Sequence, residues 1–368
     1  MKITVPLKEL NKKMTSISTI VPSKTTMPVL GTVLIGAAKD GISLSATDLD
    51  VSVTSRIEGE VGEEGTIAAP ARKLAEISKS LSGDKVDIET DGEKVKVQCG
   101  KARFVINGRY SADFPQLPKQ ESKAVFNVSK ELLSTMISKT SYAVSTDISR
   151  PALCGVLWEV DRQGLSMVAT DGHRLAKVES NVSIEGVNKT EVIVPIKALS
   201  ALKTFSEDSK EIEIGLGENS IRFNLYGNLV YSRLLEGPFP NYKKVIPTSN
   251  EKELVVSKSL LSEATKRVSI LSDALTHQVI FSLAKDKLTL NVVTQELGEA
   301  TEEIEASYND DPMDIGYNAN YIMDVLKTID TDDIVFMLDR PDNAGLIRPS
   351  SESGDMKHIC IIMPLRLS

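Results

Sequence analysis

The sequence predicts an α+β protein built from three copies of one domain, each with antiparallel sheet and two helices. One turn passage occurs three times, as L-S-A-T-D-L-D-V at 44–51, V-A-T-D-G-H-R-L at 168–175 and L-N-V-V-T-Q-E-L at 290–297. The central residues Thr47, Thr170 and Thr294 lie 123 and 124 residues apart. That spacing is the length of a domain rather than of a solenoid repeat.

Three further landmarks recur in the same order. A strand-like opening with an amphipathic run appears as I-T-V-P-L-K-E-L, F-N-V-S-K-E-L-L and L-V-V-S-K-S-L-L. A second run appears as A-P-A-R-K-L-A-E-I, V-P-I-K-A-L-S-A-L and Y-N-A-N-Y-I-M-D-V-L, and each copy closes near a proline at Pro115, Pro240 or Pro364. The register predicts domains at 1–120, 121–247 and 248–368.

Local patterning gives each copy the order helix, strands, helix, strands. Apolar residues recur at helical intervals of three and four at Leu7, Leu10, Met14 and Ile17, at Leu74, Ile77 and Leu81, and at Ile322, Val325 and Ile329. Apolar or alternating segments bounded by turns predict strands, among them 29–37, 41–46, 86–90, 94–99, 153–160, 212–216 and 281–284. Helices on one face of antiparallel sheet make an α+β class.

Composition indicates a cytoplasmic protein without cofactor or metal. The chain is 41% hydrophobic, which is enough for globular folding, and it shows neither a signal peptide nor a membrane-spanning run. Cys99, Cys154 and Cys360 form neither a disulfide framework nor a CxxC metal motif. We therefore expect a reducing compartment and no membrane partner.

The distribution of charge points to a polyanionic partner although the net charge is −8. The six predicted helical windows carry 14 Lys or Arg against five acidic residues, so they net +9 and the remainder nets −17. Basic residues on solvated helix faces are the ordinary explanation for a single helix. A positive charge shared by all six helices favours a different explanation. Basic helices that line a hole would attract duplex nucleic acid, and an acidic exterior would repel it.

Candidate catalytic groups are better explained as turns. Asp171 and His173 lack a marked nucleophile, and the three histidines show no metal-ligand spacing. The acidic pairs Asp48 and Asp50, Asp310 and Asp311, and Asp332 and Asp333 could hold magnesium in a DNA hydrolase, but turns and helix caps commonly use such pairs. A hydrolase and an acidic scaffold protein remain the rival hypotheses.

The C-terminus is apolar and basic, I-C-I-I-M-P-L-R-L at 359–367, where chain ends are usually polar. Together with D-G-H-R-L, F-P-N-Y, M-P-V-L-G, A-P-A-R-K and A-D-F-P, this tail gives an end-to-end resemblance to the bacterial DNA polymerase III beta subunit, the sliding clamp family. The resemblance implies the DNA clamp fold, a head-to-tail homodimeric ring of six domains, and no catalytic activity of its own.

The same resemblance implies a processivity factor of a polymerase holoenzyme. Such a ring encircles duplex DNA without reading its sequence. Its implied protein partners are the replicative polymerase alpha subunit, the clamp-loader complex, and repair and translesion polymerases that carry clamp-binding peptides. The expected peptide is short and extended, with a glutamine and a pair of large apolar residues near its end.

By resemblance, the partner peptide binds a cleft between the second and third domains. Leu153 and Leu175 would form its floor and Ile361, Met363 and Pro364 the opposite wall, while His173 and Arg174 would act as rim and polar positioning groups rather than as catalysts. The full predicted set is Leu153, Thr170, Gly172, His173, Arg174, Leu175, Pro240, Lys244, Val245, Asn318, Tyr321, Ile361, Met363, Pro364, Leu365 and Arg366. Lys244, Leu365, Thr276 and Asp342 depart from residues often found in the family, so selectivity of the outer groove is open.

Two more sets of residues follow from the resemblance. Weak DNA contacts are expected from Lys24, Arg72, Lys79 and Lys197. The subunit interface is expected to join Phe104 and Ile106 of one chain to Ile270 and Leu271 of the other. Physically, a head-to-tail contact joins unlike surfaces and must close at two copies.

Overall fold

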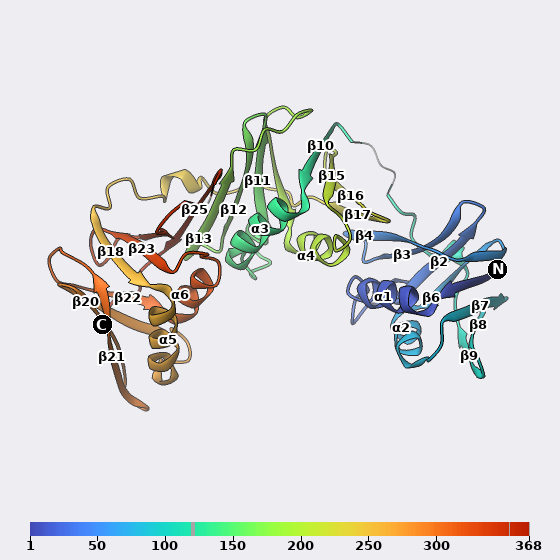
Figure 1. Ribbon diagram of the computed structural model, residues 1–368, viewed down its shortest axis with the longest axis horizontal. Coiled ribbons are helices and arrows are strands. Elements are labelled where there is room, and N and C mark those ends of the chain that lie inside the picture. The colour runs from blue at the N-terminus through green and yellow to red at the C-terminus, as the bar shows by residue number, and fades with distance from the viewer. Residues whose placement is uncertain (119–121, 353, 368) are drawn as a thin grey trace. The chain divides into compact units, whose positions relative to one another are not determined.

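A computed structural model describes residues 1–118, 122–352 and 354–367 of the chain (Figure 1). Over these residues the elements fall into three successive sets. The first comprises β1 (Lys2–Pro6), α1 (Leu7–Ile17), η1 (Pro28–Gly31), β2 (Thr32–Ala38), β3 (Gly41–Thr47), β4 (Val51–Ile57), β5 (Glu60–Glu63), β6 (Gly65–Pro70), α2 (Ala71–Ser80), β7 (Lys85–Asp91), β8 (Lys94–Cys99), β9 (Ala102–Asn107) and η2 (Ser111–Asp113).

The second and third sets repeat that order. The second comprises β10 (Ala124–Ser129), α3 (Lys130–Thr140), η3 (Ser141–Ala143), η4 (Pro151–Leu153), β11 (Gly155–Asp161), β12 (Gly164–Thr170), β13 (Arg174–Ser180), β14 (Thr190–Pro195), α4 (Ile196–Phe205), β15 (Glu211–Leu216), β16 (Ser220–Leu225), β17 (Asn228–Arg233) and η5 (Tyr242–Lys244). The third comprises β18 (Lys252–Ser257), α5 (Lys258–Val268), η6 (Ser269–Leu271), β19 (Gln278–Ala284), β20 (Lys287–Thr294), β21 (Gly298–Ser307), β22 (Met313–Asn318), α6 (Ala319–Leu326), β23 (Asp333–Leu338), β24 (Gly345–Pro349) and β25 (Met356–Ile362).

Each set runs strand, helix, four strands, helix, three strands, and the first has β5 as an additional short strand. The predicted class, three repeats of antiparallel sheet with two helices each, is therefore confirmed over the described residues. In the same part of the chain no helix is long and apolar enough to span a membrane.

The chain divides into two compact units that do not follow the repeats. One unit holds Met1–Leu132 and Lys197–Leu234, with a sheet ordered β5-β1-β7-β8-β9 and another ordered β10-β15-β16-β17-β4-β3-β2-β6. The other unit holds Leu133–Ile196 and Leu235–Ser368, with one sheet ordered β14-β11-β12-β13-β25-β24-β23-β18-β21-β20-β19-β22. Within the units, pairing of β17 with β4 and of β13 with β25 joins neighbouring repeats.

The repeated threonine has one structural role in all three copies. Thr47, Thr170 and Thr294 end the strands β3, β12 and β20. Each hydroxyl donates to the carbonyl four residues ahead, over 3.2, 2.6 and 3.4 Å respectively. A threonine that bonds to nearby backbone in this way stabilises a turn between antiparallel strands. This local role explains why the passage recurs at domain spacing.

The first predicted helix is confirmed, and two others are shorter than their apolar patterns. In α1, Leu7, Leu10, Met14 and Ile17 are all buried. Helix α2 ends at Ser80, and Leu81 is extended while its N–H still bonds to Ile77. Helix α6 ends at Leu326, and Ile329 is buried beyond it. Both apolar patterns extend beyond the end of the helix, because residues after a helix can continue to cover the same core.

Two predicted strands begin later than expected. Residues 28–31 form a 3-10 turn before β2, and residues 151–153 form another before β11. A proline opens each turn, at Pro28 and Pro151. Its fixed φ and missing N–H favour the first position of a turn over a paired strand. Apolar content alone did not distinguish these turns from strand.

Candidate functional site

The predicted cleft residues lie around a buried apolar cluster of the second unit. This cluster consists of Leu157, Val168, Leu175, Ile193, Tyr242 and Ile361, with Ala152, Leu235, Phe239, Ile246 and Ala344 packed against it. Leu175 on β13 and Ile361 on β25 are direct cross-strand partners, and both are buried. The expectation that Ile361 forms an opposite wall is therefore wrong, because paired residues lie side by side on one face.

The turn between β12 and β13 is shaped by its own backbone hydrogen bonds. The Asp171 carboxylate accepts from the backbone N–H groups of His173 and Arg174, at 2.9 and 3.0 Å. Gly172 has φ +94°, and a Cβ there would lie 3.3 Å from Nη1 of Arg150. Glycine is therefore favoured on both conformational and steric grounds. Asp171 acts as a turn residue, as the sequence predicted.

Arg174 links elements of the second and third repeats. Its Nε donates to Asp171 at 3.1 Å, its Nη1 to Asp324 on α6 at 2.7 Å, and its Nη2 to the Tyr142 carbonyl at 2.8 Å. The guanidinium also lies 4.5 Å from the centre of the Tyr321 ring and 5.3 Å from that of Tyr142. We call these five residues the Arg174 cluster.

The environment of Arg174 explains why it stays charged. Burial lowers its pKa, but the hydrogen bond to Asp324 and the charges of Asp171 and Asp324 more than offset this, so the pKa is raised. Burial raises the pKa of Asp324, whereas Arg174 and Lys327 together lower it. The Arg174 side chain is only 12% exposed and is held by its partners, which fits the polar positioning role expected for it.

The C-terminal tail lies between the turn and the third repeat. The Met363 N–H donates to the His173 carbonyl at 2.9 Å, and the Leu365 N–H donates to the Gly316 carbonyl at 2.7 Å. Further along, Gln278 donates to the Arg366 carbonyl at 3.2 Å. These bonds hold the tail in an extended conformation, with Pro364 and Leu365 half-buried and Met363 exposed. The tail is thus tied to the fold rather than fraying.

The remaining cleft residues occupy the margins of this surface. His173 is exposed, and its ring is stacked 6.5 Å from that of Tyr321. Asn318 caps α6 by accepting from the N–H groups of Asn320 and Tyr321. Leu153 is buried, Thr170 is buried at the start of the turn, and Pro240, Lys244 and Val245 are exposed. Direct contacts join His173, Arg174, Leu175, Tyr321, Ile361 and Met363, whereas the place of the other members in a common cleft stays a prediction.

The four predicted DNA-facing cations are all in the first unit, and one of them already forms an ion pair within the chain. Lys24, Arg72 and Lys79 are exposed. Lys197 instead forms an ion pair with Asp48, whose carboxylate also accepts from the backbone N–H groups of Asp50 and Val51. The intramolecular carboxylate leaves Lys197 a weaker candidate for a phosphate contact than the other three.

The basic character of the helices is confirmed but smaller than predicted. The observed helices carry 13 Lys or Arg against five acidic residues, because Lys327 lies beyond α6. Several of these cations are paired, including Lys12 with Glu207 and Asp208, Lys139 with Asp330, and Arg267 with Glu302. Only part of the positive charge is therefore available to a polyanion.

The predicted interface residues lie at sheet edges and at the end of a helix. Phe104 and Ile106 are half-buried on β9, an edge strand of its sheet. The helix expected to reach Leu271 ends at Val268, and Ile270 and Leu271 lie in the following 3-10 turn. Ile270 is 75% exposed, whereas Leu271 packs against the core of the third repeat.

Comparison with known proteins identifies the family. Residues 1–118, 127–241 and 243–366 match the N-terminal, central and C-terminal domains of the DNA polymerase III beta subunit. The chain belongs to the bacterial beta sliding clamp family. It is 33% identical to the beta sliding clamp of Pseudomonas putida and 31% identical to that of Caulobacter vibrioides, over the full length of each protein.

Solved clamp structures have the same fold. A sliding clamp from Pseudomonas aeruginosa bound to griselimycin superposes with a TM-score of 0.93 at 33% identity, and each chain is covered completely. The beta subunit of Thermotoga maritima gives a TM-score of 0.92 at 27% identity, also with complete coverage. The beta clamp family consists of non-catalytic processivity subunits of DNA polymerase III, so the hydrolase hypothesis is rejected.

The acidic pairs of this clamp chain have structural roles. Among the described residues, no group of three or more His, Cys, Asp or Glu side chains could hold a metal ion. Asp48 shapes a turn and pairs with Lys197, and the Asp311 carbonyl accepts from the Tyr308 hydroxyl. The Asp332 carbonyl accepts from the Lys258 N–H. The Asp48 carboxylate therefore has a turn role, whereas Asp311 and Asp332 take part in these contacts through their backbone carbonyls.

Sequence reasoning missed three residues that position the clamp surface. Tyr142 and Asp324 complete the Arg174 cluster. In the sequence, nothing distinguishes them from other aromatic residues or from other acidic residues on helices. Tyr242 ends the F-P-N-Y motif, but the motif alone does not indicate that its ring is buried. Its ring belongs to the buried cluster, and its hydroxyl donates to Glu159 at 2.6 Å. Burial and Glu159 raise the pKa of Tyr242, so it remains a neutral donor.

Removing the Arg174 side chain should destabilise the second unit. We expect Arg174→Ala to lower the free energy of unfolding by roughly 3 kcal/mol, because Asp171 and Asp324 would lose their buried partner. The control Arg340→Ala breaks an exposed pair with Asp342 and should cost less than about 1 kcal/mol. Urea unfolding of both variants measures this difference, and equal losses would show that the cluster is not a specific support.

Proposed function

We propose that this chain acts in the cytoplasm as a homodimeric ring that encircles duplex DNA and tethers replication and repair proteins to it. The observation that carries the proposal is the threefold repeat in a chain of the beta clamp family. We retain repeat boundaries of 1–120, 121–247 and 248–368. The replicative polymerase alpha subunit, the clamp loader, and repair and translesion polymerases are the proposed partners.

The surface around the turn at 170–174 and the C-terminal tail is the proposed peptide-binding site. Its floor is the buried apolar cluster that contains Leu175 and Ile361. Met363 and Val245 are exposed, and backbone hydrogen bonds to His173 and Tyr242 hold them beside that floor. An extended peptide could place large apolar side chains against these residues, and a few such anchors provide most of the energy in peptide recognition.

The margins of this site suit several different partners. Methionine is flexible and repacks readily against ligands of different shape, which favours Met363 in a shared site. Lys244 and Asp342 are exposed, and Asp342 lies 3.4 Å from Arg340. These charges, together with Leu365 and Thr276, should select among peptides at the margin rather than determine whether a peptide binds.

Truncating one exposed methionine tests the peptide site. Met363→Ala should weaken binding of a fluorescent peptide ending in glutamine and two large apolar residues by about tenfold, or roughly 1.4 kcal/mol. Met27→Ala is a matched control, because Met27 is 44% exposed and Met363 is 43% exposed. Fluorescence anisotropy gives the affinities. Unchanged affinity in Met363→Ala, with the peptide bound by the parent protein, would locate the site elsewhere.

Two strand edges support closure of a ring by two chains. β9 is an edge strand, and β21 pairs with β18 only through Ala306 and Ser307. Over 298–305, the edge of β21 opposite β20 thus has no strand partner among the described residues. Unpaired edges are templates for pairing with another chain. Because the two edges lie in different units, pairing them between chains would be head-to-tail.

Side chains along these edges are complementary. Arg103 lies on β9, and Glu299, Glu302, Glu303 and Glu305 lie on β21. Phe104 and Ile106 also lie on β9, and Ile270 and Leu271 follow α5, which packs against β21. We propose that these apolar residues form the centre of the interface. Opposite charges beside them would favour the head-to-tail register.

A double substitution tests this interface. Ile270→Ala combined with Leu271→Ala should convert dimers to monomers at micromolar concentration, because the apolar centre of each contact is lost. The control combines Ile148→Ala with Val182→Ala, which truncates two exposed apolar residues that are not part of the proposed interface. Sedimentation velocity measures the state of both. A double variant that still sediments as a dimer would place the interface elsewhere.

DNA would be held mainly by enclosure. Lys24, Arg72 and Lys79 are exposed and can make loose phosphate contacts, whereas Lys197 must first leave Asp48. A few weak, salt-sensitive contacts would centre the duplex without stopping its movement along the ring. Pairing of other helix cations with acidic residues supports weak rather than tight binding.

A further inference from the structure

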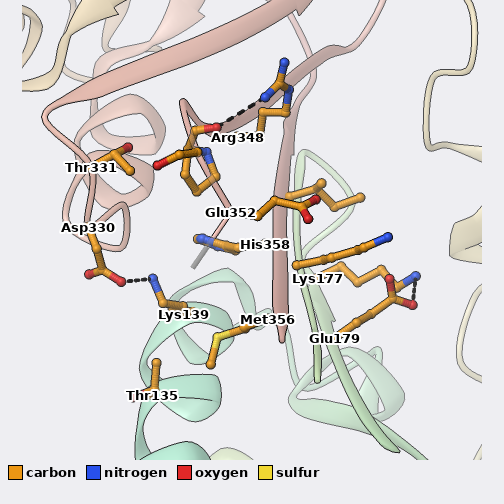
Figure 2. Close-up of a pocket in the computed structure, with 14 residues that line it drawn as sticks. Thr135, Lys139, Lys177, Glu179, Asp330, Thr331, Arg348, Glu352, Met356 and His358 are labelled. Atoms are coloured by element: carbon orange, nitrogen blue, oxygen red, sulfur yellow. Dashed lines mark hydrogen bonds and ion pairs between the residues drawn. The ribbon is translucent and has the colours of Figure 1, made fainter. Parts of the chain in front are cut away.

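A cavity lies where the hairpin of β24 and β25 opens. β24 pairs with β25 through Gly345, Leu346 and Ile347. Beyond that point Arg348 and Pro349 pair with β23, while β25 continues along β13. The opening borders a cavity of about 160 Å³, roughly five times the volume that one water occupies in the liquid. Figure 2 shows its lining residues, which come from α3, β13, β24, β25 and two loops.

His358 on β25 lines this cavity and is only 6% exposed. Its Nε2 lies 3.3 Å from Sγ of Cys360, and that sulfur accepts from the Tyr142 hydroxyl at 3.1 Å. No hydrogen bond of Nδ1 to a described residue has standard geometry, although hydrogen bonding with the Lys139 backbone raises the pKa of the ring against the effect of burial. A buried polar nitrogen without a good partner is unusual in a folded protein.

Donation from the Cys360 thiol to Nε2 would make Nδ1 the donor of the ring. Burial and the charge of Lys139 lower the pKa of His358 to about 4, so the ring is neutral at pH 7. Burial raises the pKa of the Cys360 thiol to about 11, so the sulfur keeps its proton and can donate to Nε2. The single ring proton then resides on Nδ1. An acceptor in the cavity would satisfy it.

Pairing of the other charged groups leaves a small excess of positive charge at the cavity. Asp330 is 2.6 Å from Lys139, and Glu179 is 2.6 Å from Lys177. Glu352 then remains with Arg348 and Lys357. Arg348 has a long ion pair of 3.6 Å with Glu253 and donates to the Pro349 carbonyl at 3.4 Å, and Lys357 makes no ion pair with any residue that the structure describes.

We propose that this cavity binds a small organic oxyanion, a carboxylate or phosphate ester with a compact apolar body. Its oxygens would accept hydrogen bonds from His358 Nδ1 and from the Lys357 or Arg348 side chain. The bonds from Lys357 or Arg348 would be charge-assisted. Its body would pack on Pro349, Met356 and Ile359, which also line the cavity. The cavity shares no residue with the proposed peptide-binding site, so the inference does not rest on that site.

Binding of defined probes to the full-length protein tests the proposal. Phenyl phosphate and benzoate represent the two oxyanions, and benzyl alcohol is the neutral control. Titration calorimetry should show saturable binding of at least one anion, and the ¹⁵N signals of the His358 imidazole should shift with it. Benzyl alcohol should leave both measurements unchanged.

Matched variants then locate the bound anion. Lys357→Gln should weaken binding by about tenfold, the loss typical of one charge-assisted hydrogen bond. Lys285→Gln makes the same change at an exposed lysine in the β19–β20 turn and should alter affinity less than about twofold. Arg348→Gln is a second test variant if Lys357→Gln folds poorly.

Several results would overturn the proposal. They are absence of saturable binding by both anions, equal binding of benzyl alcohol, and equal effects of Lys357→Gln and Lys285→Gln. Displacement of the anion by a clamp-binding peptide would assign it to the peptide site. Displacement by a short DNA duplex would identify a backbone phosphate, rather than a free small molecule, as the ligand.

Discussion

The antiparallel pairing of β13 with β25 is the interaction on which the proposed peptide site depends. It runs from Arg174 opposite Ile362 to Ser180 opposite Met356 and joins the second repeat to the third. This register places Leu175 beside Ile361 on the buried apolar floor. A slip of one residue would move both to the other face of the sheet. The Arg174 cluster supports the register by joining the start of β13 to α6.

Much of the fold within one repeat could be predicted from local pattern. Helical spacing identified α1, and the repeated threonine identified three turns that share one hydrogen bond. Pairing between repeats, as of β4 with β17, could not be predicted because such contacts join residues far apart in sequence. Arg174 and Asp324 are likewise 150 positions apart, so spacing gave no indication of their ion pair.

The proposed functions use different parts of the same repeated fold. Sheet edges on β9 and β21 suit contact between chains, helix cations suit a centred duplex, and the joint between β13 and β25 suits a peptide. The sequence predicted the sign of the helix charge but not its pairing, and Lys197 was overvalued because Asp48 is near it only in the folded chain. The neutral, buried His358 also required three-dimensional evidence, since its neighbours Lys139 and Tyr142 come from the second repeat.

Retention on DNA of different topology tests the central claim of enclosure most directly. The protein would be assembled on a nicked circular duplex with a clamp loader and ATP, and then separated from free protein by gel filtration at moderate salt. A closed ring should elute with the circle and be released when the DNA is linearised, because it can slide off a free end. Equal retention on circular and linear DNA would contradict enclosure and indicate binding by direct contact.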